Sequence, residues 1–232
     1  MLTKSFFLCN KEKEPLRYES LTQQINQIGI NNYSIVSYIW SDEITPELRT
    51  FYCRTDTCMR YHGRNMISYP LLNTEISLFL NHISCLRYIK QNYNNGYFAI
   101  FESDVLFYNN YLNNINTILE QASYKNDIDI INIGEGNRKI LPCSEPIHNE
   151  LHIYKEKTNK YAEGIIWTYK GLCNFLDHFD KTTDIDGPID TRIHIYSEIY
   201  GGFNIYWAYP PLVYQGSISG KFKSNIVLRN KK

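Results

Sequence analysis

Two acidic residues interrupt an apolar segment near the middle of the 232-residue chain. In YFAIFESDVLFY (97–108), one residue separates Glu102 from Asp104. Alternate side chains of a strand share a face, so an uninterrupted strand would set both carboxylates on a face that its neighbours mark as buried. Mg²⁺ and Mn²⁺ usually take one or two carboxylates together with phosphate and water. We therefore interpret Glu102 and Asp104 as ligands of a divalent cation that carries a substrate diphosphate, although many surface loops contain a similar pair.

Two other groups of residues could form part of a metal-binding or ligand-binding site. His194 and Glu198 are one helical turn apart and could bind a metal, but no third ligand follows, so a solvated helix face is the favoured interpretation. Tyr206, Trp207 and Tyr209 could stack on a sugar or a base, although packing in the core is favoured for them as well.

Composition limits the partners of the chain. It has 24 Lys and Arg against 24 Asp and Glu, and like charges cluster only in the terminal RNKK. No long-range field would attract nucleic acid or an anionic membrane, so we expect recognition to be local. The six cysteines form no C-x-x-C pair, and we expect a reduced, cytoplasmic protein. The apolar run at the N-terminus is too short for a signal sequence or a transmembrane segment.

The first 40 residues predict the unit that would position the acidic pair. SFFLCN (5–10) is typical of a buried strand, and PLRYESLTQQINQIGI (15–30) starts with proline and repeats apolar residues at helical spacing. YSIVSYIW (33–40) follows as a second strand. This β-α-β order predicts an α/β fold with a central, mostly parallel sheet flanked by helices. Ligands bind such sheets beyond the carboxyl ends of the strands.

The rest of the chain continues as one predicted domain. The clearest helix starts at Asn73 or Thr74 and closes at NNG (94–96), after which YFAIFESD enters a strand apolar enough for the centre of a parallel sheet. We expect loops with short helical pieces at 41–72, and a long loop with room for one edge strand at 135–160. The other expected elements are helices at 109–124, at 171–179 and from about Pro188, and strands at 127–136, at 162–170 and at 204–216, where Pro210 and Pro211 halt the strand.

Several short motifs resemble those of glycosyltransferase family 25, the lipooligosaccharide and procollagen galactosyltransferase-like group, in order and rough spacing. Glu75 and His82 match the Glu and His of the family's "GE-G-C-SH" helix, and Glu102, Ser103, Asp104 and Val105 stand at its "LEDDV" strand end. Pro188, Ile189 and Asp190 resemble its "P-V-D", and Gln215, Ser224 and Ile226 its "Q…S-I". FFLCN, which ends at Asn10, and Arg17 are less closely similar to its "INL…R" opening. Ser103 replaces the middle acid, and Asn81 replaces the Ser of "SH".

The resemblance implies a GT-A-type nucleotide-sugar-binding fold, with 1–134 as the nucleotide-sugar half and 135–232 as the acceptor-side half. It implies metal-dependent, inverting transfer of a hexose from a UDP-sugar donor to a glycan, a glycoprotein or a hydroxylated side chain. Mn²⁺ or Mg²⁺ would be held by Glu102 and Asp104. The residues expected at the donor are Asn10, Arg17, Glu75, His82, Glu102, Ser103 and Gln215.

Inversion by a single displacement needs a general base for the acceptor hydroxyl. Asp190 is the expected base, because it follows DGP at a predicted helix start, where free backbone N–H groups stabilise a carboxylate. The alternative is an ordinary acid in the first turn of a helix. For His82 the alternative is an ordinary helix histidine with no role at a donor.

Two other function classes stay open. A transferase fold that lost one acid at Ser103 could bind carbohydrate or a partner subunit without catalysis. A metal-dependent hydrolase could use the same carboxylates, but the chain lacks the histidine-rich ligand set common in two-metal hydrolases. Dependence of donor binding on a divalent cation separates the transferase from the binding protein.

Overall fold

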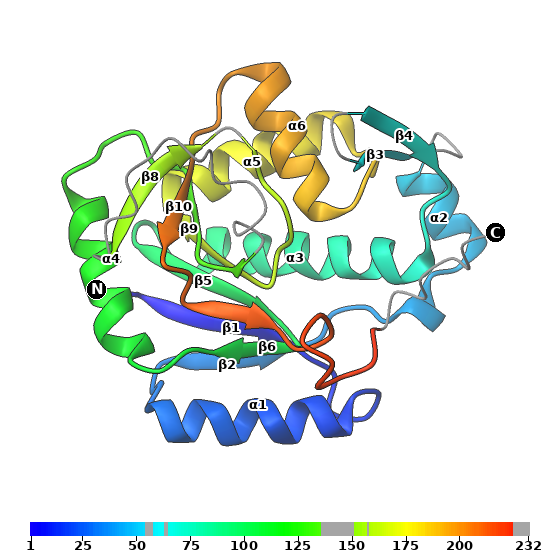
Figure 1. Ribbon diagram of the computed structural model, residues 1–232. Helices are drawn as coiled ribbons and strands as arrows, with labels where there is room; N and C mark the ends of the chain where they lie inside the picture. Colours follow the sequence, from blue (N-terminus) through cyan, green and yellow to red (C-terminus); the bar gives the residue numbers. More distant parts are fainter. Residues whose placement is uncertain (54–57, 63–64, 136–150, 157, 225–232) are drawn as a thin grey trace.

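The computed structural model describes residues 1–53, 58–62, 65–135, 151–156 and 158–224. Its centre is a seven-stranded sheet (Figure 1), and five of the seven strands run in the same direction, with β9 and β8 opposed to them. The order across the sheet is β2 (Tyr33–Val36), β1 (Lys4–Leu8), β5 (Tyr97–Glu102), β9 (Gly164–Thr168), β7 (Ile130–Asn132), β10 (Ile205–Tyr209) and β8 (His152–Glu156). The predicted α/β class with a mostly parallel sheet is confirmed.

Helices cover both faces of this sheet (Figure 1). One face carries α1 (Pro15–Ile28) and α4 (Tyr111–Ser123), and the other carries α3 (Asn73–Asn92), α5 (Tyr169–Thr182) and α6 (Ile189–Tyr200). The short η1 (Ser41–Glu43) and α2 (Pro46–Tyr52) lie between β2 and α3 in the chain. No helix within the described ranges is long and apolar enough to cross a membrane.

The core explains why the central strands are continuously apolar. Phe6 and Phe7 are adjacent on β1, point to opposite faces and are both fully buried, one in each of the two core clusters. Ile100 and Phe101 on β5 divide between the clusters in the same way. Strands buried on both faces read as uninterrupted apolar runs, and each such side chain contributes about 1.5–3 kcal/mol.

The helix boundaries follow from local sequence signals. Pro15 occupies the first turn of α1, and Gly29, with φ 82°, ends the helix in a left-handed conformation that glycine adopts without strain. Glu75 at the third position of α3 accepts a hydrogen bond from the Leu72 N–H (2.9 Å), which satisfies a backbone donor at the helix start. The predicted helix start near Pro188 is also correct, because Pro188 is the N-cap of α6.

Two features differ from the sequence-based expectations. Strand β2 stops at Val36, so residues 37–40 leave the sheet. The segment 41–72 contains an antiparallel hairpin, β3 (Cys58–His62) and β4 (Asn65–Tyr69), which we did not expect. The acidic pair lies where the strand ends, as expected: β5 ends at Glu102, and β6 (Val105–Phe107) leaves the sheet to pair with β11 (Val213–Gln215). The expected edge strand within 135–160 is β8, and residues 136–150 and 157 lie outside the described ranges.

Candidate functional site

The carboxyl ends of β1 and β5 lie side by side at one edge of the sheet. The two strands are parallel, with Leu8 opposite Glu102. The residues that follow them, including Asn10 after β1 and Asp104 after β5, therefore leave the sheet together. This edge is the ordinary ligand-binding edge of an open α/β sheet.

A pocket opens at this edge and encloses about 700 Å³, counting the open space at its mouth. Among the described residues that line it, Arg17 is the only lysine or arginine, and it faces the acids Glu14, Glu102 and Asp104. The other lining residues are Leu8, Cys9, Asn10, Ser37, Trp40, Ser41, Thr74, Ser77, Leu78, Asn81, Ser103, Gln215, Ser217 and Ser224.

Glu102 and Asp104 are held by residues from the C-terminal part of the chain. Asp104 is only 3% exposed, and its Oδ2 accepts a hydrogen bond from the Ser217 N–H (3.2 Å). The Oε2 of Glu102 accepts one from the Nε2 of Gln215 (3.5 Å). The turn at Ser103–Asp104 thus places both acidic residues in the lining of the same pocket.

The surroundings of Glu102 oppose its ionisation. Burial raises the pKa of Glu102 well above its ordinary value of 4.5, and the charges of Asp104, Glu163 and Asp190 raise this pKa further. The Arg17 guanidinium acts in the opposite direction. A bound cation would relieve this repulsion, since an opposite charge nearby favours the ionised carboxylate.

The donor set fits a cation that arrives with a phosphate substrate. Within the described part of the chain, no three His, Cys, Asp or Glu side chains are grouped so as to hold a metal ion. Glu102 and Asp104 alone could not form a complete shell. Mg²⁺ and Mn²⁺ do not need one, because phosphate oxygens and water fill their remaining positions.

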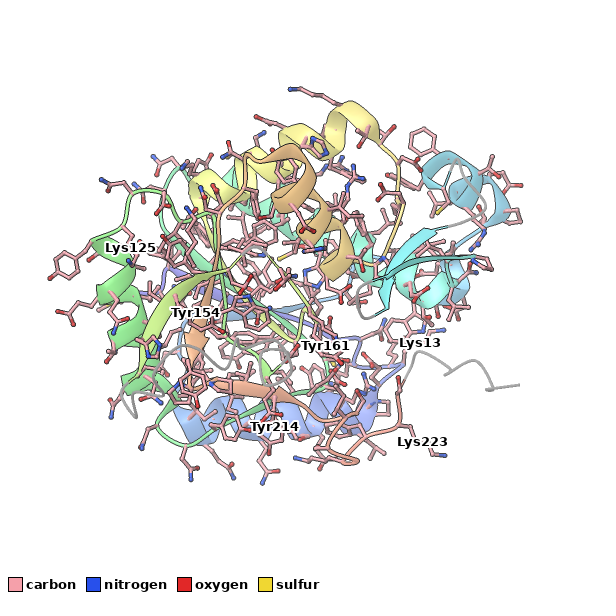
Figure 2. The ribbon with its side chains drawn as sticks, turned by 45° about the horizontal axis from the view of Figure 1, so that its top comes forward. Lys13, Lys125, Tyr154, Tyr161, Tyr214 and Lys223 are labelled. Carbon is pink, nitrogen blue, oxygen red and sulfur yellow. The ribbon has the colours of Figure 1, made fainter. Side chains whose placement is uncertain are left out.

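Arg17 is fixed by contacts from three parts of the chain. Its Nη1 donates to the Oε1 of Glu14 (3.0 Å) and to the Oγ of Ser103 (2.8 Å). Its Nη2 donates to the backbone oxygen of Lys223 (2.6 Å). Figure 2 shows Lys223 on the same side of the molecule as Lys13, so the C-terminal segment passes close to the start of α1.

Asn10 and Gln215 also line the pocket, as expected for donor-site residues. The Oδ1 of Asn10 accepts from the N–H groups of Glu12 and Lys13 (both 3.0 Å), which shapes the turn into α1. Its Nδ2 donates to the Oγ of Ser37 (3.3 Å). Asn10 therefore joins the ends of β1 and β2 as well as lining the pocket.

Asp190 lies in the first turn of α6, as its sequence context predicts. Its Oδ2 accepts from the Tyr161 N–H (3.0 Å), and its Oδ1 from the Thr191 N–H (2.8 Å). It does not line the pocket, but its charge contributes to the raised pKa of Glu102. The structure therefore brings Asp190 near the acidic pair but engages both of its oxygens with backbone.

Glu75 and His82 do not line the pocket. Glu75 is buried at the start of α3, where its carboxylate serves as the helix cap described above. His82 is fully buried, and neither ring nitrogen has a hydrogen-bond partner among the described residues. Burial lowers the pKa of His82 from 6.5 to about 3, so the imidazole is neutral. The two residues support the helix that forms one wall of the pocket.

His194 is not on a solvated face, which corrects the sequence-based interpretation. It is 2% exposed, because α6 packs against α3 and β3. Its Nε2 lies 2.8 Å from the Oε2 of Glu198. No third metal ligand joins this pair within the described residues.

Two of the three aromatic residues of β10 belong to the core, and none of the three lines the pocket. Tyr206 and Trp207 are adjacent, buried and part of opposite core clusters. The Tyr206 hydroxyl donates to the Oδ1 of Asp127 (2.9 Å), and the Trp207 Nε1 donates to the backbone oxygen of Thr158 (2.9 Å). Tyr209 packs near His152, with ring centroids 5.8 Å apart. The packing interpretation favoured from the sequence is confirmed for Tyr206 and Trp207, whereas Tyr209 is half-buried and lies outside both core clusters.

Glu163 is an acid of the site that the sequence reading missed. It is 1% exposed and directly precedes β9, and its backbone oxygen accepts from the Glu102 N–H (3.3 Å). A Cβ at Gly134 would collide with its carboxylate, so the glycine makes room for it. The sequence did contain a signal for this residue. Glu163 directly precedes the apolar run GIIWT, just as Glu102 directly follows the apolar run YFAIF.

Ser77 and Asn81 were also missed. From α3, the Oγ of Ser77 (2.9 Å) and the Nδ2 of Asn81 (2.6 Å) both donate to the backbone oxygen of Ile39. The Oδ1 of Asn81 accepts from the Tyr38 N–H (2.7 Å). This clamp holds residues 37–40 away from the sheet and brings Trp40 to the pocket. Polar residues within a helix carry no sequence signal that separates such a clamp from a solvated face.

Comparison with known proteins gave no match to a protein-family model and no match to a curated protein. The resemblance to glycosyltransferase family 25 therefore rests on the short motifs. The pocket gathers the motif residues Arg17, Glu102, Ser103, Asp104, Gln215 and Ser224. Ile226 lies outside the described residues.

Proposed function

We propose that the chain is a metal-dependent, inverting glycosyltransferase that moves a hexose from a UDP-sugar to a hydroxyl of a glycan or of a hydroxylated side chain. The observation that carries this proposal is the meeting of Glu102, Asp104 and Arg17 in one pocket at the carboxyl ends of parallel strands. Two carboxylates for a cation beside one guanidinium suit a diphosphate. A GT-A-type fold is part of the same proposal, supported by the open, mostly parallel sheet.

The pocket offers separate surfaces for the parts of such a donor. Arg17 would contact the diphosphate, and Glu102 and Asp104 would hold Mn²⁺ or Mg²⁺, which supplies charge neutralisation as the nucleoside diphosphate departs. Trp40 offers an aromatic face on which a base can stack. The hydroxyls of Ser37 and Ser41 are suited to hydrogen bonds with a ribose or a hexose.

In the transfer step, an acceptor hydroxyl attacks the anomeric carbon of the donor from the side opposite the diphosphate. The bond from that carbon to the diphosphate oxygen breaks, UDP leaves, and the configuration inverts. Asp190 would take the hydroxyl proton as general base. Its position is fixed by the N–H groups of Tyr161 and Thr191, which supports a role that requires a defined orientation.

One observation favours a binding protein without catalysis as the second candidate. Asp190 does not line the pocket, and each of its carboxylate oxygens already accepts a backbone hydrogen bond. A protein without a general base would bind the nucleotide-sugar at Arg17 and the acidic pair but would not transfer the sugar.

Release of UDP from a panel of UDP-sugars, with Mn²⁺ and candidate acceptors, tests the proposal. Asp104→Ala should abolish release, whereas Asp177→Ala should not, because Asp177 is a largely exposed acid of α5 paired with Lys90. Wild-type turnover equal to that of Asp104→Ala with every donor would contradict the proposed activity. Donor binding without turnover would favour the binding protein.

A further inference from the structure

We infer that Glu14 supplies the negative charge that the neutral Ser103 does not, and that positions 14 and 103 together carry one carboxylate that orients Arg17 in the pocket. Glu14 and Ser103 are then positioning residues for Arg17. The role of Arg17 toward a phosphate rests on the proposed function. The coupling between positions 14 and 103 rests on their contacts alone.

The three side chains form a closed triangle. The Oγ of Ser103 donates to the Oε1 of Glu14 (2.8 Å) and accepts from the Nη1 of Arg17 (2.8 Å). The same Nη1 donates to the same Oε1 (3.0 Å). Glu14 and Ser103 are each 8% exposed, so these contacts are largely shielded from water. Charge-assisted hydrogen bonds of this kind are stronger than neutral ones.

Glu14 does not make the hydrogen bond that is expected of an N-cap side chain. It is the N-cap residue of α1, but its side chain makes no cap hydrogen bond to the helix. Asn, Asp, Ser, Thr and Gly are the residues favoured at this position. Glu14 instead lies three residues before Arg17, a spacing that puts both side chains on one helix face, and it turns toward the end of β5. The contacts in the pocket account for an acid that the helix start does not require.

The charges of the pocket explain why one carboxylate at positions 14 and 103 is enough to orient Arg17. Ser103 lies in the turn between Glu102 and Asp104, within hydrogen-bond distance of a carboxylate of α1. An acid at position 103 would add a further negative charge beside Glu14, and Arg17 is the only lysine or arginine among the described pocket residues that could balance it. With a neutral residue at position 14, the Nη1 of Arg17 would lose its only charged contact in this triangle.

A double-mutant cycle tests the inference. The proteins are wild type, Glu14→Gln, Ser103→Asp and the double variant, with Ser103→Asn as the control for the size of aspartate without its charge. The readouts are the urea midpoint and the affinity for UDP with Mn²⁺. Each single variant of the cycle should bind UDP about tenfold more weakly, and the double variant should return to within about threefold of wild type, because side chains in contact couple.

The urea midpoint should follow the same pattern, with both single variants lowered and the double variant recovered. Additive losses in the double variant overturn the inference. So does Ser103→Asn if it is as damaging as Ser103→Asp, because size would then explain the effect. If Ser103→Asp does not fold, recovery of folding in the double variant supports the coupling, and failure of the double variant while Ser103→Asn folds contradicts it.

The two proposals can fail separately. If wild type does not bind UDP, the proposed function is wrong, and the urea midpoints still decide whether positions 14 and 103 share one charge. If wild type binds UDP and the losses are additive, the proposed function survives and the coupling is wrong.

Discussion

The backbone N–H of Ser217 donates to the Oδ2 of Asp104 (3.2 Å) across 113 residues of chain. The N–H of the preceding Gly216 donates to the backbone oxygen of the same aspartate (2.8 Å). The segment after β11 is therefore bound to the turn that carries the acids. A ligand in the pocket would contact the middle of the chain and this C-terminal segment together.

Gly216→Ala should weaken nucleotide binding through this contact. A Cβ at Gly216 would lie 2.6 Å from the Phe222 ring and 2.8 Å from the backbone oxygen of Asp104. The backbone oxygen cannot yield like a flexible side chain, so the segment must move, at a cost of about 1–3 kcal/mol. We expect a lower thermal midpoint and at least tenfold weaker UDP binding with Mn²⁺ in a calorimetric titration.

Ser219→Ala is the matched control, since it lies in the same segment and is exposed, and its Oγ makes a hydrogen bond to the Gly216 oxygen (3.1 Å) but none to Asp104. Its UDP affinity should stay within about twofold of wild type, because exposed substitutions of this kind usually change stability by less than about 0.5 kcal/mol. Equal losses in the two variants would show that general loosening of the segment, rather than the contact at Asp104, is responsible.

His82 should make the protein less stable in acid. Burial lowers the pKa of His82 in the folded state to about 3, against 6.5 for an unperturbed imidazole. The unfolded state therefore takes up a proton first, so stability is full above pH 6.5 and is lost as the pH falls toward 3, by up to about 1.4 kcal/mol per pH unit. Between pH 7 and pH 5, wild type should lose about 2 kcal/mol more than His82→Leu in urea unfolding.

The same slope in wild type and in His82→Leu would mean that the buried imidazole is not the source of the acid sensitivity.

The strands and helices that form the core were predictable, as was the parallel pairing of β1 and β2, but the direction of β9 was not. Helix α3 has a strong helical period of apolar residues, and strand β5 has an uninterrupted apolar run. Both lie where the sequence predicts them. Strand β9 has the same kind of run but is antiparallel to β5 and β7, because a strand buried on both faces has the same composition in either direction. The hairpin β3–β4 was missed in a segment with weak periodicity.

Some residues of the candidate site could likewise be predicted from the sequence, and others could not. Glu102 and Asp104 could be chosen because they interrupt an apolar strand, and they do lie in the pocket. Glu14 could not, because it lies in a charged stretch, and its contact with Ser103, 89 residues away in the chain, forms only in the folded protein. His82 matched a motif but is buried in the core, since a pattern of residue types does not determine which face of a helix meets the ligand.

Asp190→Asn should separate a general base from a structural acid. Asparagine can still accept the Tyr161 N–H through its carbonyl oxygen and loses the hydrogen bond from the Thr191 N–H, so the contact between α6 and the neighbouring chain should be kept. If Asp190 is the base, kcat should fall by about a hundredfold or more with UDP affinity unchanged. Unchanged kcat in Asp190→Asn, with Asp190→Ala merely less stable, would assign the residue to the helix start alone.

The most direct test of the account is calorimetric titration of UDP into wild type and into Asp104→Asn, each with Mn²⁺ and with EDTA. Asparagine keeps an oxygen that can accept the Ser217 N–H, so the loss of charge is separated from the loss of the contact. We predict UDP binding to wild type that requires Mn²⁺, and Mn²⁺-dependent binding at least tenfold weaker in Asp104→Asn. Binding that is equal with Mn²⁺ and EDTA, or an absence of UDP binding under both conditions, would contradict a metal-dependent nucleotide-sugar site at Glu102 and Asp104.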